Sequence, residues 1–199
     1  MSITGDDLPV QVTHIPGITR VKYTNSINQD VRLVTAGEDH LVRLLPSEPT
    51  ATDVIPLVLE DATQKISWIE ANSKYLVTAS EDGAVRLYQH ALQSEDDPQK
   101  ATSCIRMVRR EVLPVRCVSL ERATESPRAA ICSDELIIRV ANVEDPRQIT
   151  LLTGHTRGVR AASWSPILPL LVSCGSDGDI RVWDMSSTDG SCVKVISNQ

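Results

Sequence analysis

The sequence contains no phenylalanine, and its few tryptophans and tyrosines make up only 3% of the residues. Because 41% of the 199 residues are still hydrophobic, the core must consist mainly of valine, isoleucine, leucine and alanine. This length allows one domain with a sizeable core. The formal net charge is −6, so basic residues are not in excess. That balance argues against a surface covered with lysine and arginine for binding phosphate groups.

The sequence also lacks a C-x-x-C pair, a secretory leader and a long apolar run. The N-terminal MSITGDDLPV has no basic stretch followed by an apolar one, and no run reaches the length of a membrane span. The cysteines are odd in number and several lie in apolar runs, so we expect buried thiols, not disulfides or a zinc site. We therefore expect a soluble intracellular protein. The cysteines are Cys104, Cys117, Cys132, Cys174 and Cys192.

Four segments share one pattern: LVTAGEDHLVRLL, LVTASEDGAVRLY, AAICSDELIIRVA and LVSCGSDGDIRVW. Each contains an acid with an arginine four positions later, and the acids are Asp39, Asp82, Glu135 and Asp177. A hydroxyl residue precedes the acid by four positions in all but the third segment, which has Ile131 there. Successive acids are 43, 53 and 42 residues apart, and the loop HALQSEDDPQK explains the longer interval. The chain is therefore an internal repeat.

Each repeat is predicted to contain four short strands. Its shared segment is two alternating runs around a tight turn, for which Asp-Gly is a favoured sequence. A further apolar run precedes each segment and another follows it, as Val159–Trp164 and Val193–Ile196 do in the last repeat. No segment has convincing helical periodicity. Four-stranded units of about 40–45 residues are the blades of a β-propeller, so we expect an all-β propeller. The blades are placed at about 12–59, 64–110, 114–153 and 154–197.

The fourth repeat adds Gly154 and His155 before its first strand and Trp183 and Asp184 at the end of its third. With the turn acid, these residues resemble the WD repeat. The resemblance implies a hydrogen-bonded tetrad that ties the loop to the strands, formed by His155, Ser173, Asp177 and Trp183. A fully bonded network of this kind satisfies buried polar groups and rigidifies the blade. The other copies have Asp39, Asp82 and Glu135 as turn acids, and Leu45, Tyr88 and Ala141 replace the tryptophan.

His14 can take the histidine role in the first repeat, whereas the second and third repeats have no histidine there. Ser173, His155 and Asp177 are also the residue types of a hydrolase triad. Ser173 lies in the middle of an apolar run, without the glycines of a nucleophile elbow, so we favour the structural interpretation.

Two charged segments can be interpreted either as functional sites or as ordinary solvent-exposed surface. A basic cluster formed by Arg106, Arg109, Arg110 and Arg116 could bind nucleic acid or an acidic peptide, but no aromatic residues interleave it for base stacking. We favour a solvated blade edge, where charge blocks sheet-to-sheet aggregation. The acidic loop SEDDPQK is expected to be a surface insertion, with Ser94 as a possible regulatory serine. His40 and His90 have no metal-ligand spacing.

Propellers have four to eight blades, and WD-repeat propellers are typically seven-bladed. We therefore expect these four blades to belong to a longer ring; a closed four-bladed ring and closure by dimerisation are the alternatives. The order of the repeats, with LLTGHTRGVRAASWSP before the last one, is similar to the N-terminal propeller of a replisome adaptor family, the WD repeat and HMG-box DNA-binding proteins of the chromosome transmission fidelity group. The similarity runs from about Thr13 to Ile196.

This resemblance implies a nuclear, non-enzymatic scaffold that links the replicative helicase to DNA polymerase alpha and supports repair and cohesion. It covers only the propeller, so those contacts are not assigned to any residue of this chain, and contact with chromatin would be indirect. The alternatives are a general WD-repeat adaptor in ubiquitin ligation, traffic or RNA processing, located in the cytoplasm or nucleus, and an enzyme built on a propeller. We expect protein partners, and no cofactor, metal, membrane or small-molecule substrate.

Overall fold

The computed structural model describes residues 17–24, 32–46, 57–72, 74–89, 106–122 and 126–197. Over these residues the chain is all β, with sixteen strands and no helix. Accordingly, none of the described residues forms a helix long and apolar enough to cross a membrane.

The strands form four antiparallel sheets of four strands each, and the strand order within each sheet follows the sequence. We call these sheets blades 1 to 4. Blade 1 comprises β1 (Ile18–Thr24), β2 (Arg32–Gly37), β3 (Val42–Pro46) and β4 (Leu57–Leu59). Blade 2 comprises β5 (Ile66–Ala71), β6 (Tyr75–Ser80), β7 (Ala84–Gln89) and β8 (Arg106–Arg110). Blade 3 comprises β9 (Val115–Leu120), β10 (Arg128–Ser133), β11 (Ile137–Asn142) and β12 (Ile149–Thr153). Blade 4 comprises β13 (Val159–Trp164), β14 (Leu170–Gly175), β15 (Asp179–Asp184) and β16 (Ser191–Ser197).

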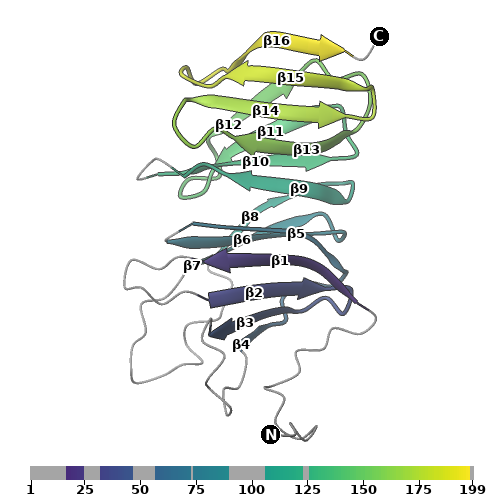
Figure 1. The fold of residues 1–199 in the computed structure, drawn as a ribbon, viewed down its shortest axis with the longest axis vertical. Helices are drawn as coiled ribbons and strands as arrows, with labels where there is room; N and C mark the ends of the chain where they lie inside the picture. Colours follow the sequence, from purple (N-terminus) through teal and green to yellow (C-terminus); the bar gives the residue numbers. More distant parts are fainter. Residues whose placement is uncertain are drawn as a thin grey trace, which may run out of the picture.

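The blades stack in chain order, with blade 1 at the bottom and blade 4 at the top of Figure 1. Their first strands, β1, β5, β9 and β13, lie against one another in succession. Each hydrophobic core lies between two neighbouring blades and not inside one sheet. Val77, Val85 and Ile131 belong to the core between blades 2 and 3, while Ile138 and Leu171 belong to the one between blades 3 and 4. Blades therefore stabilise one another by burying their aliphatic faces. The all-β propeller architecture predicted from the repeats is confirmed.

The tight turns between the second and third strands fix the blade corners. Gly83 and Gly178 have φ angles of 82° and 83°, and His40 takes φ of 67° at the same place in blade 1. Glycine reaches this left-handed region without steric cost, whereas histidine pays a small one. In blade 3 Leu136 fills the position without a positive φ, so this turn has another backbone form. The four turns and the described loops before β5, β9 and β13 lie at the same end of the blades.

One face of blade 4 is covered by no described strand. Val172, Ile180 and Ile196 are exposed on it, and so is Cys174. The expectation of buried thiols is right for Cys117 and Cys132, but it is wrong for Cys174 and Cys192, both of which are exposed. Alternation in a strand shows that two faces exist, but the sequence of one blade does not show which face another blade covers. Cys104 lies outside the described residues.

Candidate functional site

The four residues assigned to the tetrad meet in blade 4, between the loop before β13 and the strands β14 and β15. His155 Nδ1 lies 2.8 Å from Asp177 Oδ2, and His155 Nε2 lies 2.8 Å from Ser173 Oγ. Trp183 Nε1 donates to the same Ser173 Oγ over 2.9 Å. A carboxylate only accepts, so the Nδ1 of His155 donates to Asp177. Both ring nitrogens of His155, the hydroxyl of Ser173 and the indole nitrogen of Trp183 are thereby hydrogen-bonded.

The Asp177 carboxylate is also held by the backbone. Thr156 N and Asp179 N donate to it over 2.9 and 3.1 Å. Burial alone would raise the pKa of Asp177, but these amide hydrogen bonds and the bond from His155 outweigh it and lower the pKa from 3.8 to about 2. Asp177 is therefore ionised throughout the physiological range, and it ties the loop to the turn.

The connectivity of His155 matches that of a hydrolase triad, with the carboxylate on Nδ1 and the serine on Nε2. The accessibility of Ser173, however, does not match that of a triad serine. Ser173 is only 2% exposed, and its oxygen is held between the imidazole of His155 and the indole N–H of Trp183. These two features favour a structural role for the serine.

Blade 2 binds its turn acid with a different set of partners. Arg86 Nη2 lies 2.8 Å from Asp82 Oδ2, and Thr63 N donates to the same oxygen over 3.1 Å. Burial alone would raise the pKa of Asp82, but hydrogen bonds from Arg86 and Ser80 hold it well below its usual range. Counted back from the first strand, Ala62 occupies the position of His155. Arginine thus replaces histidine as the partner of the acid.

Blade 2 has a hydroxyl at the serine position of the tetrad, although it lacks the histidine and the tryptophan. Thr78 is the counterpart of Ser173, because each pairs with the arginine of the next strand. Its buried hydroxyl finds no hydrogen-bond partner among the described residues. Tyr88, the counterpart of Trp183, sends its hydroxyl to Asp61 over 3.0 Å instead. Blade 2 therefore has the hydroxyl at the tetrad position, but this hydroxyl does not join the loop to the strands.

Blade 3 puts an acid where blade 4 has histidine. Strand register places Glu111 at the position of His155, since Val115 and Val159 pair with equivalent residues. Arg139 Nη1 lies 3.1 Å from Glu111 Oε2 and 2.6 Å from Glu135 Oε2. One arginine thereby joins the loop acid and the turn acid. The sequence pattern did not single out Glu111, although counting four residues back from Val115 finds it.

Blades 1 and 4 differ in what their arginine binds. In blade 1 Arg43 Nη1 lies 2.7 Å from the turn acid Asp39, and His14 lies outside the described residues. In blade 4 Arg181 Nη2 bonds Asp179 over 3.1 Å, and its buried Nε has no partner among the described residues. His155 already occupies Asp177, so the arginine of the repeat is displaced to the next acid.

The identity of the residue two places before the turn acid depends on whether the blade has the histidine. Gly175 stands there in blade 4, and a Cβ on it would lie 2.7 Å from both His155 Nδ1 and Asp177 Oδ1. Blades 2 and 3, which lack the histidine, have Ser80 and Ser133 there, and Ser80 Oγ bonds both Asp82 and Arg86. Glycine leaves room for the imidazole, and serine fills that room where the imidazole is missing.

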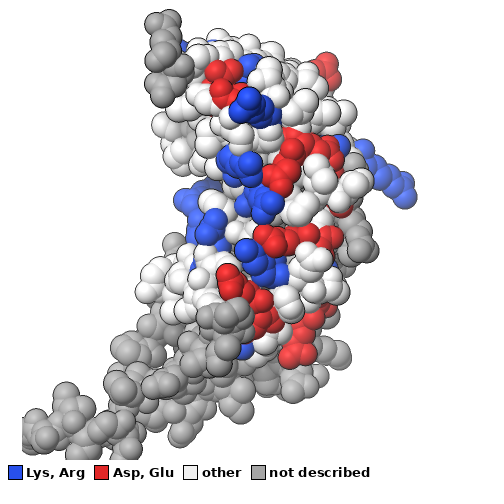
Figure 2. Space-filling model, turned by 90° about the vertical axis from the view of Figure 1, so that its right-hand side faces the viewer, with Lys and Arg blue, Asp and Glu red and all other residues white. Residues whose placement is uncertain are grey.

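A ladder of ion pairs crosses from blade to blade at the turn end. Glu81 lies between Lys65 (3.4 Å) and Arg116 (3.1 Å), and Asp134 lies between Arg116 (2.6 Å) and Arg160 (2.8 Å). We call these five residues the charge ladder. Figure 2 shows acidic and basic side chains alternating along the height of this face. Of the basic cluster noted in the sequence, Arg116 is thus engaged between blades 2 and 3, and the other three side chains lie outside the described part.

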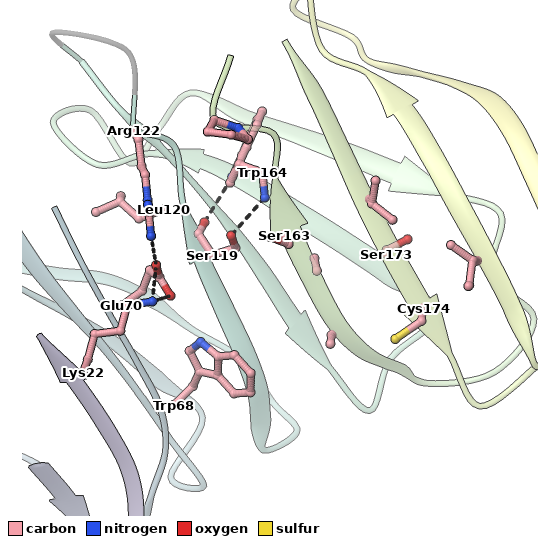
Figure 3. A pocket seen from close by; sticks show the side chains of 15 residues that line it. Lys22, Trp68, Glu70, Ser119, Leu120, Arg122, Ser163, Trp164, Ser173 and Cys174 are labelled. Atoms are coloured by element: carbon pink, nitrogen blue, oxygen red, sulfur yellow. Dashed lines mark hydrogen bonds and ion pairs between the residues drawn. The ribbon is translucent and has the colours of Figure 1, made fainter. Parts of the chain in front are cut away.

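A cavity of about 660 Å³ opens beside the first strands and the uncovered face of blade 4. In Figure 3 Lys22 and Arg122 both reach toward Glu70, and Lys22 Nζ lies 2.9 Å from Glu70 Oε1. Ser119 is engaged as well, because its Oγ and its carbonyl accept from Trp164 N and Nε1. Both cations at this cavity are thus paired with the same carboxylate, that of Glu70. Among the described residues, no cluster of three or more metal-ligating side chains occurs here or elsewhere.

Comparison with known proteins agrees with this geometry. The WD domain, G-beta repeat family matches residues 59–89 and 146–184, which contain the turns of blades 2 and 4. WD repeat and HMG-box DNA-binding protein 1 of Xenopus laevis is 28% identical over 183 residues, which is 92% of this chain and 14% of that protein. Human striatin-4 is 30% identical over 129 residues, covering 59% of this chain and 17% of that protein. Nuclear distribution protein nudF 1 of Talaromyces marneffei is 43% identical over 68 residues, covering 34% of this chain and 14% of that protein.

Residues 59–89 and 146–184 are thus WD repeats, and the four blades with their turn acids have the architecture of a WD-repeat propeller, a kind of domain that serves as a scaffold for protein–protein interaction. The chain spans about a sixth of the length of these curated relatives or less.

Proposed function

We propose that the protein is a non-enzymatic adaptor of the replication fork, in which this propeller presents a surface to protein partners in the nucleus. One observation carries the proposal. Similarity to the Xenopus WD repeat and HMG-box DNA-binding protein extends over 92% of the chain, whereas similarity to striatin-4 covers 59% and to nudF 1 only 34%. This longer match supports the proposal because it spans all four blades, including β9 to β11, which lie outside the residues matched as WD repeats.

The structure of the blades is compatible with a scaffold. Ser173 is buried and doubly bonded, and the charged groups of the cavity are paired with one another. The turn end, in contrast, offers a continuous charged face across blades 2 to 4. Loops on a rigid framework are where binding residues usually lie.

The test is affinity purification of the full-length protein, tagged at its own locus, from nuclease-treated extracts of S-phase cells. The proposal expects DNA polymerase alpha and replicative helicase subunits to be recovered, together with nuclear localisation of the tagged protein. The matched control is a tagged WD-repeat protein of similar abundance. Recovery of an unrelated complex in place of these subunits, or exclusion of the protein from the nucleus, would overturn the proposal in favour of a different WD-repeat adaptor.

A further inference from the structure

Blade 3 exposes three aliphatic side chains at the turn end. Val112 is 94% exposed, Leu113 39% and Leu136 49%. The first two lie in the loop before β9, and Leu136 lies in the turn between β10 and β11. We call these three residues the blade 3 patch. Single exposed aliphatic residues are ordinary, but a group of them on one face is unfavourable in water and marks a candidate binding site for a partner.

The neighbouring blades do not share this feature. At the positions equivalent to Val112 and Leu113, blade 2 has Thr63 and Gln64, and blade 4 has Thr156 and Arg157. At the position of Leu136 both of these blades have a glycine with positive φ. The repeat itself therefore does not require aliphatic residues at these three places. Blade 3 departs from it at all three, in two loops that are separate in the sequence.

Contacts at the base of these loops bring the three residues together. Arg139 bonds both Glu111 and Glu135, and these two acids directly precede Val112 and Leu136 in the chain. The loop before β9 is fixed on its other side, because Glu111 N donates to Gly83 O over 2.7 Å. The two loops of the patch are thus joined at their base by a partly buried set of ion pairs.

The charge ladder provides the rim of the patch. Asp134 lies two residues before Leu136 and is bonded by Arg116 and Arg160. The side chains of these arginines are 34% and 53% exposed, while those of Asp134 and Glu81 are less exposed than either. In the ladder three cations share two carboxylates, and the cations are the outer groups. An approaching chain would meet guanidinium groups first, which favours carboxylates on that chain.

We propose that the blade 3 patch and the arginines beside it form a docking site for a peptide segment of a partner protein that carries aliphatic side chains next to acidic residues. An aliphatic anchor would cover Val112, Leu113 and Leu136, and its acidic neighbours would bond Arg116 and Arg160. This proposal deepens the adaptor role and rests on it, because it names the chemistry of a partner. It does not depend on which complex that partner belongs to.

The experiment titrates labelled synthetic peptides into the full chain and follows fluorescence anisotropy. The probe is a short peptide with two leucines among glutamates. Its two matched forms replace the leucines with serine or the glutamates with lysine. The expected result is saturable binding of the first peptide, weakened at least about tenfold in either matched form. Binding should also weaken as ionic strength rises, because exposed charge pairs are screened by salt.

The protein variant for this test carries Val112→Thr, Leu113→Gln and Leu136→Ser, which introduces polar residues at exposed positions and leaves the core intact. Ile167→Ser with Leu168→Ser is the matched control, because these aliphatic residues are also exposed but lie in the loop between β13 and β14, at the other end of the strands. The patch variant should bind at least about tenfold more weakly, and the control variant should bind like the parent. Unchanged unfolding midpoints would show that both variants are folded.

Equal binding by the parent and the patch variant, preference for the lysine peptide, or tighter binding of a single-stranded oligonucleotide at the patch would overturn the proposal. So would the lack of any saturable binding by the parent. These outcomes leave the purification experiment untouched, because replisome subunits can be recovered through other surfaces. Conversely, failure to recover those subunits leaves peptide binding at the patch to be judged by its own titration.

Discussion

Replacing one hydroxyl in blade 4 and its counterpart in blade 2 should have opposite effects on stability. Ser173 Oγ satisfies both His155 Nε2 and Trp183 Nε1, whereas the buried hydroxyl of Thr78 satisfies nothing among the described residues. Ser173→Ala therefore leaves a buried acceptor and a buried donor without partners. Thr78→Val removes an unpaired hydroxyl and preserves the shape of the side chain.

The magnitudes follow from the cost of unpaired buried groups. Each group left without a partner costs about 1–3 kcal/mol, so Ser173→Ala, which leaves two such groups, should lower the free energy of unfolding by about 2–6 kcal/mol. The cavity left by one oxygen adds little to this loss. Thr78→Val should raise the free energy of unfolding by about 1 kcal/mol, because the hydroxyl no longer has to be buried unbonded. The total stability of a domain is about 5–15 kcal/mol, so both changes are measurable.

The assay is urea unfolding of the full chain followed by tryptophan fluorescence and far-UV circular dichroism. Coincident transitions and an unchanged dependence on urea would justify comparing the free energies. Ser163→Ala is the control, since this serine lies on β13 but is exposed. A loss below about 0.5 kcal/mol for Ser173→Ala, or equal losses for Ser173→Ala and Thr78→Val, would refute the reasoning about which hydroxyl is bonded.

Three further outcomes follow from blade 4. Trp183→Ala should lower the free energy of unfolding by about 3–5 kcal/mol, because the ring is almost fully buried, and a urea-measured loss below about 1 kcal/mol would contradict that burial. Gly175→Ser should cost about 1–3 kcal/mol by crowding His155 and Asp177, and the same substitution made in a His155→Ala background should cost much less in the same assay. The lowered pKa of Asp177 means that the unfolded chain takes up this proton first, so its contribution to stability is complete above about pH 4 and is lost as pH falls towards 2. Acid titrations of unfolding should therefore fall less steeply in Asp177→Asn than in the parent.

Strands and turns could be predicted from the sequence because their signals are local. Alternation in segments such as LVSCGSDGDIRVW gives the strands, and the acid with its following glycine gives the turn. The geometry around His155 follows the resemblance to the WD repeat, whose residues lie at fixed offsets. The partners of the turn acids in blades 1 to 3 were not predictable in this way, because several residue types can satisfy one carboxylate.

Glu111 shows why. An acid in a loop ordinarily faces solvent, and only strand register reveals that this one replaces a histidine and shares Arg139 with Glu135. Arg181 shows the converse, since its spacing from Asp177 equals that in the other repeats, but His155 already holds that carboxylate. Exposure of Cys174 was missed because burial of a strand face depends on the neighbouring blade. Competition for partners and the covering of faces are properties of the assembled blades.

The central claim is that blade 4 joins its entry loop to its turn through one buried pair, His155 and Asp177. The most direct measurement is a double-mutant cycle with His155→Ala, Asp177→Ala and the double variant in urea unfolding of the full chain. The account predicts a coupling free energy of about 1–3 kcal/mol, with the second substitution costing much less than the first. Strictly additive losses, with a coupling free energy near zero, would show that the two side chains do not act together.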